Sequence, residues 1–466
     1  MNIRNLAKKL PYPIKHGQEY ASGIIPLSIR HGKVFRDTYK FLQESQWWSR
    51  EKLEDYQMWQ LNKLIHHAYD NVLYYRNLFD EKGLKPRDIR DFDDLRKLPY
   101  LTKDIMRNNL SDLIAQNYSK RELQYAATSG SSGVPLWFYL EKKVSDPKER
   151  AFVWRQWNWA GYKLGQRRVI LRGNLINRFR NRKRQWWEYK PANNTLILSS
   201  YDMTKEKLTK YIDKIKTFRP VAIQGYPSSL YILANFLKNR CSKLRNIKCI
   251  LTSSEKLYRH QKETIEAYLG GRIYDLYGNT EASVLIMQCE KGRYHIMPEY
   301  GITELIGEDG NPVNEDGKIG EIVGTGFNNL AVPFIRYRTG DLGIYTQEKC
   351  SCCRQYQLIK GIEGRSQEFF IAKDGDLISL GDMQIYFVFD NVKQFQFYQE
   401  EKGKATFKIV KKDTYSEKDT QRIEKALEAR FGERIDLKIR FVDNIPRTKS
   451  GKYRFLIQKL QIDFGD

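Results

Sequence analysis

Apolar side chains along the first hundred residues recur with the period of a helix. The run MWQLNKLIHHAYDNVLYYRNLF has apolar positions three or four residues apart, among them Leu61, Leu64, Ile65, Ala68 and Val72. This spacing places them on one face of a helix. Pro99 then interrupts the pattern, because proline lacks the amide donor that a helix interior needs. We therefore predict a mostly helical start over residues 1–100.

From about residue 120 to 340 the pattern changes to short β-prone runs that alternate with amphipathic runs. VAIQGY (221–226), KCILTSSE (248–255) and RIYDLYG (272–278) each end in turn-forming residues, which is typical of strands. The stretches between them, SSLYILANFLKNR and YRHQKETIEAYLG, have helical spacing. Such alternation predicts an α/β fold whose functional sites lie at the carboxyl ends of the strands.

The last hundred residues form a different pattern. TFKIVKK and LKIRFVD are β-prone, and the run EKDTQRIEKALEARFGE lies between them. That run places Ile423, Leu427 and Phe431 on one helical face and ends at Gly432, a frequent helix stop. The pattern predicts a separate small α+β unit.

Composition adds limits to this picture. A chain of 466 residues with 41% hydrophobic content is long enough for two or three domains. The formal net charge of +24 attracts anions such as nucleotides, anionic lipid or nucleic acid, although a basic host compartment explains it equally well. We find no run of 18 or more apolar residues and no signal peptide, so we expect a cytoplasmic protein.

Two motifs suit phosphate and metal binding. TSGSSGVP (128–135) is rich in small polar residues and glycine, and its amides and hydroxyls can surround phosphates. YGNTE (277–281) follows a β-prone run; Glu281 can hold Mg²⁺ and Thr280 can contact a phosphate. Either motif alone also fits an ordinary polar turn.

Three further motifs follow towards the C-terminus. RYRTGD (336–341) presents a carboxylate in a turn that can accept both hydroxyls of a ribose. GIEGR (361–365) contains an arginine suited to an anionic nucleotide. PRTKSGK (446–452) is a basic segment, which also fits a solvated charged loop.

In this order and spacing, the five motifs resemble the core motifs of the adenylate-forming superfamily of acyl-CoA synthetases, luciferases and peptide-synthetase adenylation domains. The chain is most similar to the phenylacetate-CoA ligase-like branch, including CapK-type proteins associated with polysaccharide gene clusters. The resemblance implies an AMP-forming ligase that activates a carboxylic acid as its acyl-adenylate with ATP and Mg²⁺. It also implies a large N-terminal AMP-binding domain (1–366) and a small mobile C-terminal domain (367–466), joined near Gln367.

The same resemblance assigns nucleotide-binding residues. The ATP phosphates would lie in the loop formed by Thr128, Ser129, Gly130, Ser131, Ser132 and Gly133. The adenine side would be formed by Ser253, Ser254 and Glu255, with Tyr277 stacking near the base and Gly278 and Asn279 beside it. Asp341 would hold the ribose hydroxyls, and Arg365 would bind the nucleotide near the hinge.

Catalytic and acyl-binding residues are assigned in the same way. Thr280 would contact the α-phosphate, and Glu281 would bind Mg²⁺. Lys452 would neutralise charge between the attacking carboxylate and the α-phosphate, an electrostatic role. Tyr226 matches the acyl-pocket segment.

The acceptor of the acyl group stays open. Val134 replaces the usual lysine of the first loop, Gln367 replaces the usual hinge aspartate, and the segment after it matches CoA ligases poorly. The acceptor is therefore CoA, or an amine or hydroxyl on a glycan or lipid-linked intermediate. A nucleotide-binding scaffold without catalytic activity is the non-enzyme alternative.

Cysteines suggest a second kind of site. Three of six fall within one tetrapeptide as Cys350, Cys352 and Cys353, and Cys289 and His295 form a pair upstream. Three thiolates and one imidazole are the ligands that a tetrahedral structural Zn²⁺ prefers. We predict zinc ligation by Cys289, His295, Cys350 and Cys352, with Cys353 as the alternate for Cys352; unpaired thiols are the other interpretation.

A basic stretch (172–184) precedes Trp186 and Trp187. Cations beside tryptophans suit peripheral contact with an anionic membrane surface, and a solvated insertion is the alternative. No nucleic-acid-binding motif accompanies the stretch, so we expect no nucleic-acid partner.

Overall fold

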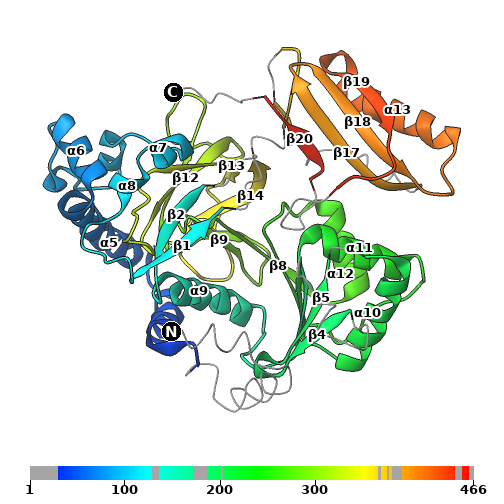
Figure 1. Ribbon diagram of the computed structural model, residues 1–466, viewed down its shortest axis with the longest axis horizontal. Helices are drawn as coiled ribbons and strands as arrows, with labels where there is room; N and C mark the ends of the chain where they lie inside the picture. The colour runs from blue at the N-terminus through cyan, green and yellow to red at the C-terminus, as the bar shows by residue number, and fades with distance from the viewer. Residues whose placement is uncertain are drawn as a thin grey trace.

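The computed structural model describes residues 30–128, 136–172, 186–200, 203–365, 369–374, 377–379, 391–446 and 454–460. They form a large part and a small C-terminal part (Figure 1). The predicted helical start is confirmed within the described residues. Its helices are α4 (Gly32–Ser45), α5 (Arg50–Asn71), α6 (Leu73–Glu81), α7 (Lys103–Asn108) and α8 (Leu110–Leu113). The apolar stripe of α5 is buried with α6 against the hairpin formed by β1 (Leu123–Ala127) and β2 (Trp137–Glu141).

A twelve-stranded mixed sheet forms the centre of the large part, in the order β11-β12-β13-β14-β10-β9-β8-β7-β6-β3-β5-β4. Its strands are β3 (Arg168–Arg172), β4 (Trp187–Lys190), β5 (Thr195–Ser199), β6 (Ala222–Gly225), β7 (Cys249–Ser253), β8 (Arg272–Gly278), β9 (Leu285–Gln288), β10 (Tyr294–Ile296), β11 (Gly301–Ile306), β12 (Ile319–Gly326), β13 (Tyr337–Tyr345) and β14 (Leu358–Arg365). The three strands predicted between 221 and 278 are therefore confirmed as β6, β7 and β8.

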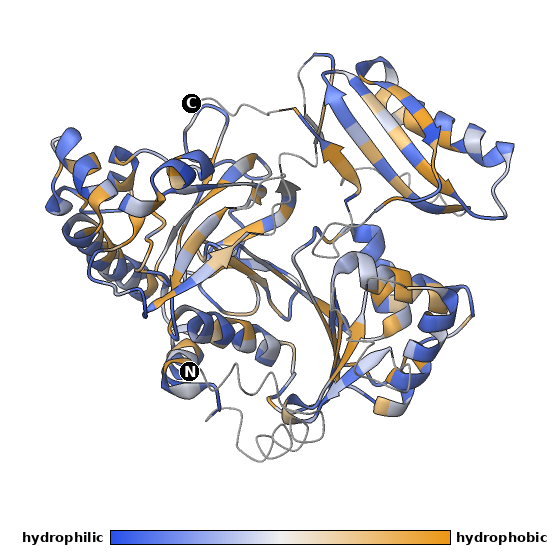
Figure 2. Ribbon diagram, in the orientation of Figure 1, coloured by the Kyte–Doolittle hydropathy of each residue, from blue (hydrophilic) through white to orange (hydrophobic). Residues whose placement is uncertain are grey.

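Helices cover both faces of the parallel half of this sheet, which runs β5-β3-β6-β7-β8. One face packs its alternate residues, such as Leu171 and Ile250, against α10 (Lys205–Phe218), α11 (Pro227–Lys238) and α12 (Arg259–Leu269). The other face, including Leu251, packs against α9 (Ser145–Trp159). Figure 2 shows that apolar residues concentrate where strands and helices meet. This is the layering that α/β alternation predicts.

The small part is a separate α+β unit, as predicted. Its sheet has the order β19-β18-β17-β20 and carries α13. Its elements are β17 (Val392–Glu401), β18 (Lys404–Lys411), α13 (Glu417–Phe431), β19 (Asp436–Phe441) and β20 (Leu456–Gln458), with a hairpin of β15 (Phe369–Ile371) and β16 (Leu377–Ser379) beside them. Gly432 ends α13 with a φ of +52°, a conformation that glycine adopts readily.

One aromatic contact docks the small part against the large part. Tyr258, which precedes α12, is only 4% exposed and belongs to the apolar core of the small part. Its ring meets Phe455 edge to face, with 5.6 Å between centroids. The small part therefore lies beside α11 and α12 (Figure 1). The predicted junction at Gln367 lies outside the described residues.

Among the described helices, none combines the length and the apolar character that crossing a bilayer requires.

Candidate active site and metal centre

Two of the predicted motifs meet at the carboxyl end of β8. Tyr277 lies near the end of that strand, and its hydroxyl donates a hydrogen bond of 2.8 Å to Oδ2 of Asp341 on β13. The two residues are 64 positions apart in the sequence. This contact brings the segment assigned to adenine next to the carboxylate assigned to ribose. It is the arrangement that one nucleoside would need.

Asp341 is set by its own strand rather than by an isolated turn. RYRTGD is mostly part of β13, which pairs with β12 on one side and β14 on the other. The Asp341 amide donates to the hydroxyl of Thr339 (3.0 Å), and that hydroxyl donates to the carbonyl of Ile322 (2.7 Å). The motif was expected in a turn. The difference arises because Tyr337 and Arg338 pair with β12 and Asp341 pairs with β14, with a bulge between them where Gly340 has a φ of +75°.

The loop after β8 fixes Glu281 and presents Thr280. The Asn279 carboxamide oxygen accepts hydrogen bonds from the amides of Ser283 (3.0 Å) and Val284 (3.3 Å), which holds the loop in a tight turn. Thr280 is exposed on it. Glu281 is only 6% exposed, and its Oε1 accepts a hydrogen bond of 2.7 Å from the Tyr337 hydroxyl. A carboxylate oriented in this way suits Mg²⁺, a hard cation that prefers oxygen ligands.

The segment after β7 is tied to helix α11. The Glu255 carboxylate accepts a hydrogen bond of 3.0 Å from the amide of Ser228, in the first turn of that helix. Ser254 has a φ of +71°, so the chain turns sharply between Ser253 and Glu255. Acidic groups stabilise helix N-termini. Glu255 therefore positions the loop that carries Tyr226, in addition to any contact with a nucleotide.

Two charged residues that the sequence did not single out lie near these motifs. Lys256 forms an ion pair of 2.7 Å with Glu363 on β14, and also donates to the Glu363 carbonyl (3.1 Å). Arg172, seen earlier only as the first residue of a basic stretch, donates from Nη2 to the Ser253 hydroxyl (2.5 Å). Its guanidinium carbon lies 5.3 Å from the ring centroid of Tyr226. The sequence signal that could have identified Arg172 is its position directly after the short apolar run VIL.

Other predicted residues lie at the margins of this site or outside it. Thr128 closes the base of the β1–β2 loop, because its hydroxyl accepts from the Leu136 amide (3.0 Å). Arg365 ends β14 and is the backbone partner of Asp341. The remaining loop residues Ser129, Gly130, Ser131, Ser132 and Gly133, together with Lys452, are outside the described residues.

The two tryptophans that follow the basic stretch are partly buried in the large part. Trp186 and Trp187 pack against the apolar core of the parallel half. Lysines of α10 lie over their rings: Lys210 Nζ is 3.9 Å from the Trp186 centroid, and Lys214 Nζ is 5.6 Å from that of Trp187. Both rings are thus partly buried within this chain.

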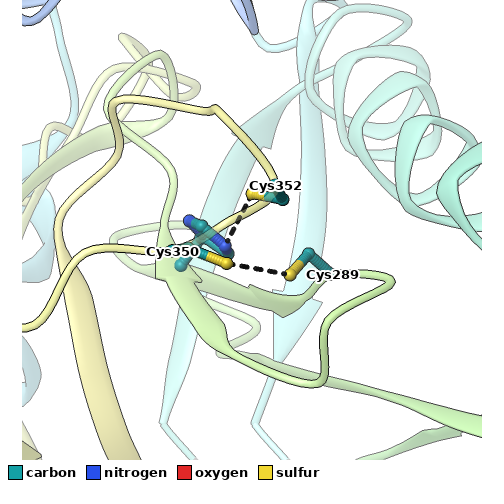
Figure 3. Close-up of side chains that lie close together, drawn as sticks. Cys289, Cys350 and Cys352 are labelled. Atoms are coloured by element: carbon teal, nitrogen blue, oxygen red, sulfur yellow. Dashed lines mark hydrogen bonds between the residues drawn. The ribbon is translucent and has the colours of Figure 1, made fainter.

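The four predicted zinc ligands come together in space. Cys289 follows β9, His295 lies on β10, and Cys350 and Cys352 lie on the loop between β13 and β14 (Figure 3). Their ligand atoms all fall within 4.8 Å of one another. The Sγ atoms of Cys289 and Cys350 are 3.7 Å apart, and Cys352 Sγ lies 3.5 Å from His295 Nε2. Zn–S bonds near 2.3 Å in a tetrahedron place two sulfurs about 3.8 Å apart, so the set fits Zn²⁺.

The surroundings of the four ligands also fit a thiolate-bound metal. Cys289 and His295 are fully buried, and the Lys291 amide donates to Cys289 Sγ (3.3 Å). The contacts with Cys289 and His295 lower the pKa of the Cys352 thiol, whereas the contact with Cys352 and burial raise the pKa of Cys289, so Cys352 is the thiol that ionises first. Cys353 is exposed, and its Sγ is 3.9 Å from the Ser351 carbonyl. The structure thus groups Cys352 with the other three ligands.

Comparisons with known proteins agree with this architecture. The family described as the CapK C-terminal domain matches residues 370–459. Protein CapK of Staphylococcus aureus is 24% identical over 94% of this chain and 95% of its own length. The phenylacetate-coenzyme A ligase of Thermus thermophilus is 27% identical over 70% of this chain and 73% of its own length.

Solved structures share the fold. The crystal structure of 2-hydroxyisobutyryl-CoA ligase in the postadenylation state aligns with a TM-score of 0.68 at 17% identity. The alignment covers 89% of this chain and 93% of that one. The large sheet and the small C-terminal part agree with this structure. Together these similarities support the predicted placement of the chain among the adenylate-forming, AMP-forming ligases, in the branch of phenylacetate-CoA ligase-like and CapK-type proteins.

Proposed function

We propose that this chain activates a carboxylic acid with ATP and Mg²⁺ as the acyl-adenylate, and then transfers the acyl group to an acceptor. The observation that carries the proposal is the hydrogen bond between Tyr277 and Asp341. It joins the adenine-side motif on β8 to the ribose-side motif on β13. The exposed Thr280 and the buried Glu281 follow directly on the same loop, where the phosphates of a nucleotide held by Asp341 would lie.

Each residue then has a physical task. Asp341 accepts hydrogen bonds from the ribose hydroxyls, while Tyr277 contacts the base. The Thr280 hydroxyl donates to the α-phosphate. Mg²⁺ held by Glu281 would neutralise phosphate charge, and Tyr337 keeps that carboxylate in one orientation. Lys452 is proposed to stabilise the charge that builds up as the carboxylate attacks, so the catalysis is mainly positioning and electrostatics.

CoA and a glycan or lipid-linked acceptor are the two candidates for the second step. The similarity to phenylacetate-coenzyme A ligases supports CoA as the acceptor. The similarity to CapK supports a glycan or lipid-linked acceptor, because CapK-type proteins are associated with polysaccharide gene clusters. This similarity spans 94% of the chain, and the CapK C-terminal domain family matches the small part. A net charge of +24 suits either candidate, because CoA and a phosphate-bearing glycan or lipid intermediate are all anionic.

Carboxylate-dependent ATP–pyrophosphate exchange tests the first step. The full chain is incubated with Mg²⁺, ATP, labelled pyrophosphate and a panel of aryl, aliphatic, hydroxy and dicarboxylic acids. We expect exchange that depends on one class of acid and is lost in Asp341→Ala. Tight ATP binding with no exchange for any acid would instead support the nucleotide-binding scaffold. Adding CoA and measuring thioester then decides between the two acceptors.

We also propose that Cys289, His295, Cys350 and Cys352 hold a structural Zn²⁺. Three thiolates and one imidazole complete a tetrahedral shell and leave no position for a reacting water. The ion would join the β13–β14 loop to β9 and β10, close to the strand that carries Glu363 and Arg365. Its loss is therefore expected to destabilise the large part and to affect activity only indirectly.

A further inference from the structure

Arg172 lies in a row of side chains that crosses the sheet at the carboxyl ends of its parallel strands. Leu171 on β3 is level with Gly225 on β6, and Gly225 is level with Thr252 on β7. The next position on each strand therefore brings Arg172, Tyr226 and Ser253 into one row. Ser253 is in turn level with Leu276, the residue before Tyr277 on β8. The row thus leads from Arg172 to the start of the proposed nucleotide site.

The Arg172 side chain points to the α9 face of the sheet. Leu171 packs with α10 and α11 on the opposite face, and successive residues of a strand point to opposite sides. The hydrogen bond to Ser253 and the position over the Tyr226 ring agree with this direction. Tyr226 belongs to the segment assigned to the acyl pocket, so the guanidinium lies where the acyl part of a substrate would bind.

The hydrogen-bonding capacity of this guanidinium is only partly used. Nη2 donates to Ser253, but Nε is buried and finds no hydrogen-bond partner among the described residues. No carboxylate within the described ranges forms an ion pair with Arg172. Glu255 is the acid whose charge acts on it, and one Glu255 oxygen already accepts the Ser228 amide of α11. Burial lowers the pKa of Arg172, which is the mark of a cation that has lost water without a full replacement.

Other arginines of the described chain differ from Arg172 in their surroundings. Arg155 pairs with Glu299 at 2.7 Å, and Arg336 forms two hydrogen bonds with Glu304. Arg168, on the same strand and face as Arg172, also lacks a partner for Nε and Nη1 in the described chain, but aromatic rings enclose it: the Trp157 ring lies at 4.3 Å, with two further rings within 6.0 Å. Arg172 is only partly buried and lies at the carboxyl ends of the parallel strands, so a ligand that binds there can complete its hydrogen bonding.

The position separates this cation from the reacting carboxylate. Thr280 and Glu281 follow β8, whereas the Arg172 guanidinium lies beside Ser253 on β7, about 5 Å away in the direction across the strands. Thr280 is also four residues beyond the level of Leu276. Arg172 and Thr280 therefore differ in both strand and level, which leaves room for two groups of one substrate.

We propose that Arg172 binds a second anionic group of the acyl substrate, so that the acids activated by this chain carry a carboxylate, phosphate or sulfate a few bonds from the reacting carboxylate. The inference rests on the proposed adenylating function and names the class of its substrate. The planar guanidinium can donate two parallel hydrogen bonds to such a group, and Nε is one of the donors. Tyr226 covers the guanidinium and limits its movement.

Calorimetric titration with matched acids tests this inference directly. The full chain, saturated with a non-hydrolysable ATP analogue and Mg²⁺, is titrated with pairs in which one member lacks the second charge: succinate and succinamate, glutarate and glutaramate, 3-phosphonopropionate and its P,P-dimethyl ester. We expect the more charged member of at least one pair to bind about 30-fold more tightly or better. In Arg172→Met this preference should fall below about threefold, while Arg172→Lys should keep part of it.

Arg168→Met is the matched control, because it removes a buried arginine from the same strand and face at the opposite edge of the sheet. It should lower the melting temperature and leave the charge preference intact. The inference is overturned if no pair is discriminated by the unaltered chain, if neither member of any pair binds, or if Arg172→Met keeps the preference. Charge discrimination without exchange activity for any acid would contradict the proposed function but not this site.

Discussion

The hydroxyl of Tyr337 offers a sharp test of how Glu281 is oriented. Tyr337→Phe removes one hydrogen-bond donor, 2.7 Å from Glu281 Oε1, and leaves the fully buried ring in place against Phe334. A hydrogen bond to a charged group contributes about 1.5–3 kcal/mol. If the bond acts mainly by holding Glu281 ready for Mg²⁺, its loss should lower exchange activity about 10- to 100-fold, since each 1.4 kcal/mol is a factor of ten. The Mg²⁺ concentration for half-maximal exchange should rise.

Exchange rates across a Mg²⁺ titration, with denaturant unfolding of the same samples, measure both effects. Tyr75→Phe is the matched control: Tyr75 is 2% exposed, belongs to the same apolar core, donates to the Pro333 carbonyl (2.9 Å) and accepts from the Ile335 amide (3.3 Å), so its hydroxyl is bonded to backbone groups and not to Glu281. It should lose about 1 kcal/mol of stability and keep its Mg²⁺ dependence. Unchanged Mg²⁺ dependence in Tyr337→Phe, or an equal change in Tyr75→Phe, would refute the reasoning.

Three further predictions concern the proposed residues. Lys452→Ala should lower kcat for adenylation by on the order of 100-fold while ATP binding by calorimetry stays close to normal, because the charge acts mainly in the transition state; near-normal exchange would contradict this role. Asp341→Ala should weaken binding of an ATP analogue, and unchanged affinity would mean that the carboxylate only supports β13. Protein purified without chelator should contain one equivalent of zinc, and Cys289→Ser should remove it and lower the melting temperature; less than about a tenth of an equivalent with all six thiols titratable would exclude the zinc site.

Local patterns were enough to predict many elements of the fold. Strands β6, β7 and β8 were predicted because short β-prone runs end in turn-forming residues. Helices α11 and α12 were predicted because the apolar residues between those runs have helical spacing. The four candidate zinc ligands were predicted from local patterns too, since Cys350 and Cys352 share one tetrapeptide and Cys289 and His295 form a close pair upstream. RYRTGD was expected in a turn and is largely strand, because its conformation depends on pairing with β12 and β14, which lie elsewhere in the sequence.

The features that the sequence did not reveal depend on strand order. Arg172 is 81 residues from Ser253, and Lys256 is 107 residues from Glu363. Only the order β3-β6-β7 and the approach of β14 bring these residues together. Composition places Arg172 in a basic stretch, where most such residues are solvated. Its partial burial and its position beside Ser253 are properties of the folded chain alone.

The docking of Tyr258 on Phe455 has a consequence for the balance between orientations of the small part. Moving the small part away would return most of the Tyr258 ring to water, and burying a large side chain is worth about 2 kcal/mol. That amount corresponds to a ratio of about 30 to 1 in favour of the docked orientation, unless another arrangement covers the ring as well. Tyr258 is also only three residues from Glu255. Burial of the Tyr258 side chain is therefore expected to favour the docked orientation of the small part. We predict that replacing Tyr258 with a small residue increases the fraction of molecules in which the two parts are separated.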